Sequence, residues 1–286
     1  MNGAGPGSFA ARRVTPAPFP GEARPAAVRP PFAIWTDPAP RPGWMNMAID
    51  CALLERAEAG ERWIRLYAWE PHCLSFGRHE PAMRRYDRER IEALGLRVVR
   101  RPTGGRAVWH ARELTYAVAA PTEHLGSLRD AYREIHRMLR EALITLGAPA
   151  ELADARRPSG LDAGACFAGP AGGEVLVHGR KVIGSAQLRQ GAALLQHGSV
   201  LLHDDQSTVA VVTRGVPPPD GSLPLTRALG RPIGWGEAAA AIAAAAAARW
   251  GGTTPSTPGS PALLDRAVDL AARFRSPTWT WTGADG

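Results

Sequence analysis

Hydrophobic and polar positions divide the chain into short strands and a small set of helices. Side chains that alternate between apolar and polar, or short apolar runs bounded by turn residues, predict strands. The expected strands are 63–69, 73–76, 96–100, 113–119, 174–178, 181–183 and 194–202. Apolar positions that repeat every three or four residues predict helices. The expected helices are 46–59, 84–94, 129–147, 235–250 and 263–274.

Local signals set the ends of these elements and the class of fold. Asn46 can cap the first helix with its side-chain oxygen, and Gly95 can end the second. Gly179 separates two strands and predicts a hairpin. Turns this short join antiparallel strands, because a parallel pair needs a long crossover. We therefore predict the α/β (α+β) class, with a mixed, mostly antiparallel sheet and helices packed on it, and a parallel sheet is the weaker alternative.

Composition divides the chain into domain and connecting segments. Residues 1–31 are rich in Ala, Pro, Arg and Gly without an apolar run, which predicts a disordered tail and argues against a signal peptide. Residues 32–250 are expected to form one large domain. Residues 251–262 are a linker rich in Pro, Ser, Thr and Gly, and 263–286 are expected to form a short helix and tail.

The net charge and the cysteine content limit the kinds of binding partner and the cellular compartment that we expect for the protein. The chain has 286 residues and a net charge of +7, with a pI of about 10.1, which favours an acidic partner such as nucleic acid or an acidic protein. Its three cysteines form no disulfide framework and match no metal-ligand spacing, so we expect a reducing cytoplasm and no metal site. No apolar run is long enough to span a membrane, and we expect no membrane partner.

Lys181 is the single lysine among the 34 basic residues. Lysine differs from arginine in being a compact cation that can lose its proton. Cys166 precedes it, in a stretch rich in Gly, Pro and Ala (156–173) that predicts a loop. Because the thiolate is the reactive form of cysteine and an ammonium group lowers the pKa of a nearby thiol, the two residues suggest a nucleophile and its activator. From composition alone, a chance lysine and a small buried cysteine explain the pattern equally well.

A glycine pair lies between two arginines in the segment from Arg101 to His110. Gly104 and Gly105 allow backbone amides to approach an anion or a carbonyl closely. The spacing fits neither a phosphate-binding P-loop nor a dinucleotide-binding fingerprint. An ordinary glycine hairpin with solvated arginines is the alternative interpretation.

Several segments along the chain resemble the biotin/lipoyl protein ligase (BPL/LPL) catalytic domain. The segments are NMAID (46–50), RLYAWEPHCLSFGR (65–78), RRPTGGRAVWHARELTYAV (100–118), GRKVIGSAQLR (179–189), LLQHGS (194–199) and RFRSPTWTW (273–281). Together they cover 33–281, so the resemblance implies this fold, with 32–250 as the catalytic domain.

Three activities of this family compete. Lipoate–protein ligases, which use ATP, usually carry an Asn-Asp pair where this chain has Ala165-Cys166-Phe167. Amidotransferases that move octanoyl groups between lipoyl proteins typically have Cys-Pro-Gly at this place. Octanoyltransferases of the LipM type carry Ala-Cys-Phe, a lysine and Gly-Ser-Ala-Gln, which this chain matches at Cys166, Lys181 and 184–187. Leu188, where arginine is common, and the small residues 171–173 depart from that pattern.

The resemblance to the LipM type implies a mechanism. Cys166 takes an octanoyl group from octanoyl–acyl carrier protein as a thioester, and a lysine of a lipoyl-domain protein, such as the glycine cleavage H protein, then takes it as an amide. Lys181 would lower the pKa of Cys166 and relay a proton. Both steps start from a thioester, so no ATP or other cofactor is expected. The implied substrate-binding residues are Arg101, Thr103, Gly104, Gly105, Arg106, His110, Gly184, Ser185, Ala186, Gln187, His197 and Gly198.

A non-catalytic nucleic-acid-binding protein is the rival from a different class. The high pI is consistent with it, but the arginines are scattered and no basic, aromatic-rich strand platform appears. We therefore expect no nucleic-acid partner, and we expect a monomer.

Overall fold

The structure is a computed structural model. It describes Met1 and residues 31–37, 39–154, 172–217, 219–251, 254–255 and 260–284. The expected nucleophile, Cys166, lies outside the described residues, as do 2–30 of the expected tail and 252–253 and 256–259 of the expected linker.

Within the described residues, the larger sheet has six strands in the order β10-β11-β6-β2-β1-β12. They are β10 (Ile183–Gln190), β11 (Ala193–Leu201), β6 (Glu113–Pro121), β2 (Trp63–Tyr67), β1 (Ala33–Thr36) and β12 (Thr254–Pro255). Neighbours from β10 to β2 are antiparallel, whereas β1 is parallel to both β2 and β12. The predicted mixed, mostly antiparallel sheet is therefore confirmed.

Two small sheets flank the larger one. The first contains β4 (Arg97–Arg100), β3 (Cys73–Phe76) and β5 (Val108–His110), and the second contains β7 (Ala150–Leu152), β8 (Val175–Val177) and β9 (Arg180–Lys181). The predicted hairpin is β8–β9, with His178 and Gly179 both at positive φ in the turn. Positive φ at both central residues is what a two-residue hairpin turn requires.

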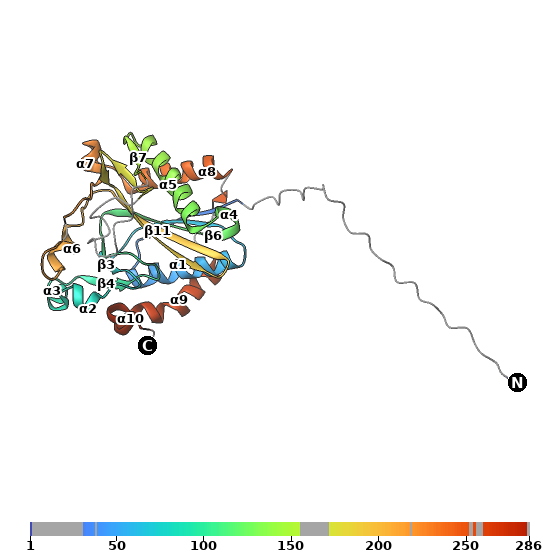
Figure 1. Ribbon diagram of the computed structural model, residues 1–286, viewed down its shortest axis with the longest axis horizontal. Coiled ribbons are helices and arrows are strands. Elements are labelled where there is room, and N and C mark those ends of the chain that lie inside the picture. Colours follow the sequence, from blue (N-terminus) through green and yellow to red (C-terminus); the bar gives the residue numbers. More distant parts are fainter. Residues whose placement is uncertain are drawn as a thin grey trace.

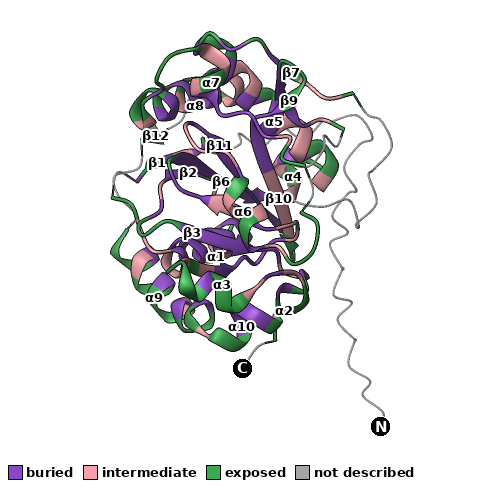
Figure 2. Ribbon diagram, turned by 90° about the vertical axis from the view of Figure 1, so that its left-hand side faces the viewer, coloured by how far each residue is buried: buried purple, intermediate pink, exposed green. Residues whose placement is uncertain are grey.

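Helices cover both faces of the larger sheet (Figures 1 and 2). α5 (Leu128–Thr145) and α8 (Trp235–Trp250) share one apolar cluster with alternate residues of β6, such as Tyr116 and Val118. α1 (Gly43–Glu58) and α9 (Pro261–Arg275) share another with the intervening residues of β6, such as Ala117. The remaining helices are α2 (Ala82–Arg85), α3 (Arg88–Ala93), α4 (Thr122–Leu125), α6 (Ser207–Val212), α7 (Leu225–Leu229) and α10 (Pro277–Thr282). β6 is thus buried on both sides, which explains why its sequence is almost entirely apolar.

Two expected helix boundaries are wrong. Asn46 does not cap α1, which begins at Gly43 after Pro42. Instead Asn46 is fully buried, and its side-chain oxygen accepts a hydrogen bond from Arg65 at 2.8 Å. The single helix expected at 84–94 is two helices, because Tyr86 is extended and buries its ring, and Asp87 caps α3. Asn46, a favourable capping residue, therefore makes a buried contact instead of a cap, whereas Asp87 forms a cap that the sequence did not predict.

α10 is joined to the chain near β4 by one buried side chain, Arg100. Its guanidinium donates to the carbonyl oxygens of Trp279, Thr280 and Trp281. These carbonyls belong to the last turn of α10, where helical N–H partners run out, and among the described residues only the Trp279 carbonyl also accepts from a backbone N–H, that of Gly283. The same guanidinium also donates to the carbonyl oxygens of Gly77, Arg78 and Glu80. Arg100 therefore fastens α10 to the loop that follows β3.

Among the described residues, no helix is both long enough and apolar enough to cross a membrane.

Candidate functional site

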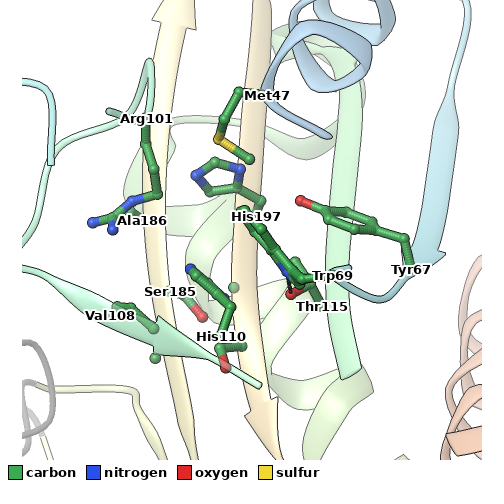
Figure 3. A pocket seen from close by; sticks show the side chains of 13 residues that line it. Met47, Tyr67, Trp69, Arg101, Val108, His110, Thr115, Ser185, Ala186 and His197 are labelled. Atoms are coloured by element: carbon green, nitrogen blue, oxygen red, sulfur yellow. Dashed lines mark hydrogen bonds between the residues drawn. The ribbon is translucent and has the colours of Figure 1, made fainter. Parts of the chain in front are cut away.

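A pocket opens on the larger sheet where β10 and β11 face the loop between β4 and β5. It encloses about 320 Å³ of space not filled by atoms, part of it open to solvent. Figure 3 shows Arg101 and Tyr67 on opposite sides of His197. The lining residues are Met47, Tyr67, Trp69, Arg101, Val108, His110, Thr115, Gly184, Ser185, Ala186, His197, Gly198 and Ser199.

His110 is held on one wall by a carboxylate and a hydroxyl. Its Nδ1 lies 2.8 Å from Glu113 Oε1, and its Nε2 lies 2.7 Å from Ser75 Oγ. The imidazole stacks on Trp69, with ring centroids 4.0 Å apart. Burial lowers the pKa of His110, although Glu113 opposes that effect. A neutral imidazole fixed on both nitrogens orients its neighbours but does not move freely.

His197 occupies a matching arrangement on β11. Its Nδ1 lies 2.8 Å from Asp50 Oδ2, and its Nε2 lies 2.6 Å from Thr103 Oγ1. Asp50 also accepts from the Tyr67 hydroxyl at 2.8 Å and pairs with Arg65 at 3.3 Å. Asp50 and Arg65 are completely buried. α1 is therefore connected through Asp50 to the pocket and to the loop that holds Thr103.

The loop between β4 and β5, residues 101–107, contains Gly104 and Gly105 and supports one wall of the pocket. Arg101 is the member of this loop that reaches the lining, and it donates to the carbonyl oxygens of Gly104 and Arg106 at 3.1 and 2.8 Å. Gly105 has φ +93°, and a Cβ added to Gly77 would lie 1.9 Å from its carbonyl oxygen. Two backbone segments can approach this closely only because Gly77 lacks a side chain. The loop conformation is thus fixed by backbone packing.

Lys181 forms a buried ion pair. Its Nζ lies 2.5 Å from Glu174 Oε1, and both side chains are nearly inaccessible to solvent. Glu174 directly precedes β8, on the C-terminal side of the segment that contains Cys166. The backbone there is joined to the N-terminal side of that segment by two hydrogen bonds, from Ala153 N to Glu174 O and from Gly173 N to Ala153 O, both at 2.8 Å. The ends of the segment with the expected nucleophile therefore lie beside Lys181.

His136 of α5 lies next to this ion pair and was not expected from the sequence. It is fully buried, with Nδ1 2.7 Å from the Gly173 carbonyl oxygen and Nε2 2.8 Å from Ser185 Oγ. Burial lowers its pKa to about 4, the bond to Gly173 opposes the shift, and the charge of Lys181 adds to it. The side chain is neutral at physiological pH.

The shifted pKa of His136 predicts a pH-dependent stability. Because the pKa is lower in the folded state than the ordinary 6.5, the unfolded chain binds the proton more readily between these values. The contribution of His136 is therefore complete above pH 6.5 and is lost as the pH falls toward 4, by about 1.4 kcal/mol per pH unit. Urea unfolding of the parent and of His136→Gln across this range should show their difference in unfolding free energy changing with that slope. A difference that stays constant with pH would contradict the assignment.

The structure brings most of the candidate residues together. Arg101, His110, Gly184, Ser185, Ala186, His197 and Gly198 line the pocket. Thr103, Gly104, Gly105, Arg106 and Gln187 lie outside its lining, and Thr103 and Gln187 bond to side chains of β11. Cys166 lies outside the described residues. Four further polar residues at the site were not expected from the sequence, because their only signal was a polar position within an otherwise apolar element or beside a motif. They are Asp50, Glu113, His136 and Glu174.

In the described parts of the chain, no group of three or more His, Cys, Asp or Glu side chains is placed to hold a metal ion.

Comparison with known proteins gives relatives in one family. The sequence profile described as "Lipoyl protein ligase A/B catalytic domain" matches residues 42–245. The octanoyltransferase LipM of Symbiobacterium thermophilum is 40% identical over 229 residues, which are 72% of this chain and 82% of that protein. The octanoyltransferase LipM of Carboxydothermus hydrogenoformans is 44% identical over 168 residues, which are 57% of this chain and 62% of that protein.

Solved structures share the fold at low sequence identity. A bi-partite lipoate protein ligase of Thermoplasma acidophilum, solved in a study with its E2 lipoyl domain, superposes with a TM-score of 0.71 at 18% identity. That superposition covers 90% of this chain and 97% of the other. A lipoate-protein ligase A bound with ATP gives a TM-score of 0.68 at 17% identity, covering 89% and 99%. These similarities concern the arrangement of the backbone.

Proposed function

Because this chain belongs to the lipoyl protein ligase A/B catalytic domain family and is an acyltransferase of the octanoyltransferase LipM type, we propose that it transfers octanoyl groups through a thioester on Cys166. The donor is octanoyl–acyl carrier protein. The acceptor is a lysine of a lipoyl-domain protein, and the glycine cleavage H protein is our candidate. The reaction belongs to lipoate biosynthesis.

The position of Lys181 is the observation that carries this proposal. The single lysine of the chain is buried beside both anchored ends of the segment with Cys166. It also lies immediately before β10, which contributes Gly184, Ser185 and Ala186 to the pocket. This arrangement supports a cysteine that works next to a lysine and delivers an acyl chain into the pocket. The apolar members of the lining, including Met47 and Trp69, suit a hydrocarbon chain.

The two steps balance without ATP. In the first, the Cys166 thiolate attacks the carbonyl carbon of the donor thioester, a new C–S bond forms, and the carrier leaves as a thiol after taking up a proton. In the second, the acceptor amine attacks the enzyme thioester, a C–N bond forms and the C–S bond breaks. The Lys181 ammonium donates a proton to the leaving sulfur and is then reprotonated by the proton that the amine loses. Lysine can do this because its ammonium group exchanges protons near neutral pH when its surroundings favour it.

The charge of the protein supports an acidic donor. A net charge of +7 favours encounter with an acidic carrier, because opposite charges raise the rate of association. We place the reaction in the cytoplasm and the enzyme as a monomer. No nucleic-acid or membrane partner is part of the proposal.

The test is the mass of the intact protein after mixing with octanoyl–acyl carrier protein in the absence of ATP. One octanoyl group should be added and should be removed by hydroxylamine, which cleaves thioesters. Cys166→Ser should abolish this labelling. Labelling that requires ATP would instead indicate a lipoate–protein ligase.

Cys51→Ser and Cys73→Ser are the matched controls and should label like the parent. Burial raises the pKa of Cys51 to about 12 and that of Cys73 well above its ordinary range. Neither thiol is therefore ionised at neutral pH, and a thiol must ionise to attack a thioester. Loss of labelling in either control without loss of folding would place the nucleophile elsewhere.

A further inference from the structure

The side chains of β10 become larger along the face of the sheet that carries the pocket. Side chains of a strand alternate between its two faces, so Gly184, Ala186 and Leu188 share one face. Gly184 and Ala186 line the pocket. Leu188 lies outside the lining and packs, half-buried, against the apolar cluster that includes Met47. Along this face the side chain therefore grows from a hydrogen atom to a methyl group and then to an isobutyl group.

The neighbouring strand β11 shows where the pocket ends. Ser199 and His197, the partners of the first two positions, both line the pocket. Leu188 is paired with Leu195, which is fully buried in the same apolar cluster. Side chains of such a cross-strand pair lie in contact on one face of the sheet. The pocket therefore lies over the first two pairs, and the pair of leucines fills the third position.

The helix α1 covers the strands at this end of the pocket. Asp50 Oδ2 lies 2.8 Å from His197 Nδ1, and Glu58 Oε2 accepts from Gln190 Nε2 at 2.8 Å. Leu54 lies one helical turn from each of these acidic residues and is buried in the same apolar cluster. The helix is thus held against the strands on both sides of the leucine pair, so that this end of the pocket is closed.

The position of Lys181 indicates how an acyl chain lies in the pocket. Lys181 precedes Gly184 by three residues, at the opposite end of this face from Leu188. An acyl chain whose carbonyl group reacts beside Lys181 extends along β10 with its methyl end toward Leu188. We infer that Leu188 sets the length of the acyl chain that the enzyme accepts, because its side chain closes the pocket at the methyl end. This inference rests on the proposed function, which places the reacting carbonyl group near Lys181.

A closed end limits chain length by contact. A longer chain has to displace Leu188 or leave methylene groups in water, and each methylene group that becomes buried favours binding by about four-fold. Replacing leucine by alanine leaves a cavity at the closed end, large enough for about two further methylene groups. Leu188→Ala is therefore expected to accept a decanoyl chain in place of an octanoyl chain.

The test offers the enzyme an equimolar mixture of octanoyl– and decanoyl–acyl carrier protein, and the intact mass reports which chain is loaded first. Leu188→Ala should raise the ratio of decanoyl to octanoyl loading by about ten-fold or more over the parent. Leu264→Ala is the matched control, because Leu264 is half-buried against the same apolar cluster but belongs to α9, which packs on α1. This control should keep the parent ratio, and thermal unfolding checks that both variants are folded.

Ala186→Leu should shift the preference in the opposite direction. The added carbon atoms move the closed end of the pocket one cross-strand pair closer to Gly184. In a mixture of hexanoyl– and octanoyl–acyl carrier protein, the ratio of hexanoyl to octanoyl loading should rise by about ten-fold or more. A preference for longer chains in this variant as well would indicate a general loosening of the pocket and would overturn the role of Leu188.

Calorimetric binding of free octanoic and decanoic acid separates this inference from the proposed function, since the acids bind without a loading step. If the parent does not load but Leu188→Ala shifts the ratio of the two dissociation constants toward decanoic acid, the proposed transfer is wrong and Leu188 still limits chain length. An unchanged loading ratio in Leu188→Ala, or an unchanged binding ratio where the parent does not load, overturns the inference. A parent that neither loads nor binds an acid overturns both.

Discussion

Lys181→Arg is expected to keep much of the reactivity of Cys166 and still to lose transfer to the acceptor amine by roughly 10²–10⁴-fold, the range of general acid–base catalysis. Arginine retains the positive charge that favours a thiolate. Its guanidinium is bulkier and is never deprotonated in proteins, so it cannot accept and return the amine proton. Lys181→Met should lose both properties, and the pKa of the thiol should rise toward that of free cysteine, about 8.5.

The measurement is the pH dependence of iodoacetamide alkylation at Cys166, together with single-turnover transfer, for the parent and both variants. Lys181→Met also breaks the buried ion pair with Glu174, which costs about 3–5 kcal/mol of unfolding free energy. The double variant Lys181→Met/Glu174→Gln removes the charge of both members of the pair and is the matched control. It should recover stability without recovering transfer. If Lys181→Arg transfers octanoyl as fast as the parent, the lysine is not a proton relay.

Asp50→Asn is expected to lower the unfolding free energy by about 3–5 kcal/mol, because it removes one of the two carboxylates that compensate the buried Arg65. Arg65 is fully inaccessible and keeps only Asp37, whose Oδ2 lies 2.9 Å from it and is shared with Arg41. Each kcal/mol corresponds to roughly 2–4 °C in the unfolding midpoint for a domain of about this size. We therefore expect the midpoint to fall by roughly 6–20 °C.

Thermal and urea unfolding measure this change, and His197→Gln is the control. That variant loses the bond to Asp50 but keeps the Asp50–Arg65 pair, so it should cost only about 0.5–1.5 kcal/mol, typical of a single hydrogen bond. Its effect should instead appear in activity, because His197 also holds Thr103 in the loop behind the pocket. Equal destabilisation by both substitutions would show that the ion pair is not what makes Asp50 costly to replace.

The sheet was predictable because its signals are local. The hairpin at Gly179 needs two positive φ values, and the alternation in β2 reports a strand directly. The strand β10 was harder to predict from the sequence, since its GSAQLRQ segment is partly exposed and polar. Its strand form comes from eight residue pairs with β11, which no local propensity encodes.

The residues of the site could be predicted only where they belong to a recognisable sequence motif. Glycine and histidine positions in the 100–118 and 179–199 segments pointed to the pocket, and Ser185 and His197 are there. Asp50, Glu174 and His136 are each the polar partner of a residue distant in sequence, for example His197 for Asp50. Such pairings depend on how elements pack, so a single sequence gives no signal for them beyond an unexplained buried charge.

The bonds of Arg100 to α10 also bear on the order in which the fold is completed during synthesis. The three carbonyl groups of α10 that its guanidinium binds lie 179–181 residues further along the chain. At ribosomal rates of about 5–20 residues per second, α10 is made roughly 10–40 s after β4. During that interval the guanidinium can already donate to the carbonyl oxygens of Gly77, Arg78 and Glu80, but its bonds to α10 are not yet formed. The contact between α10 and the loop that follows β3 is therefore among the last contacts of the fold to be completed during synthesis.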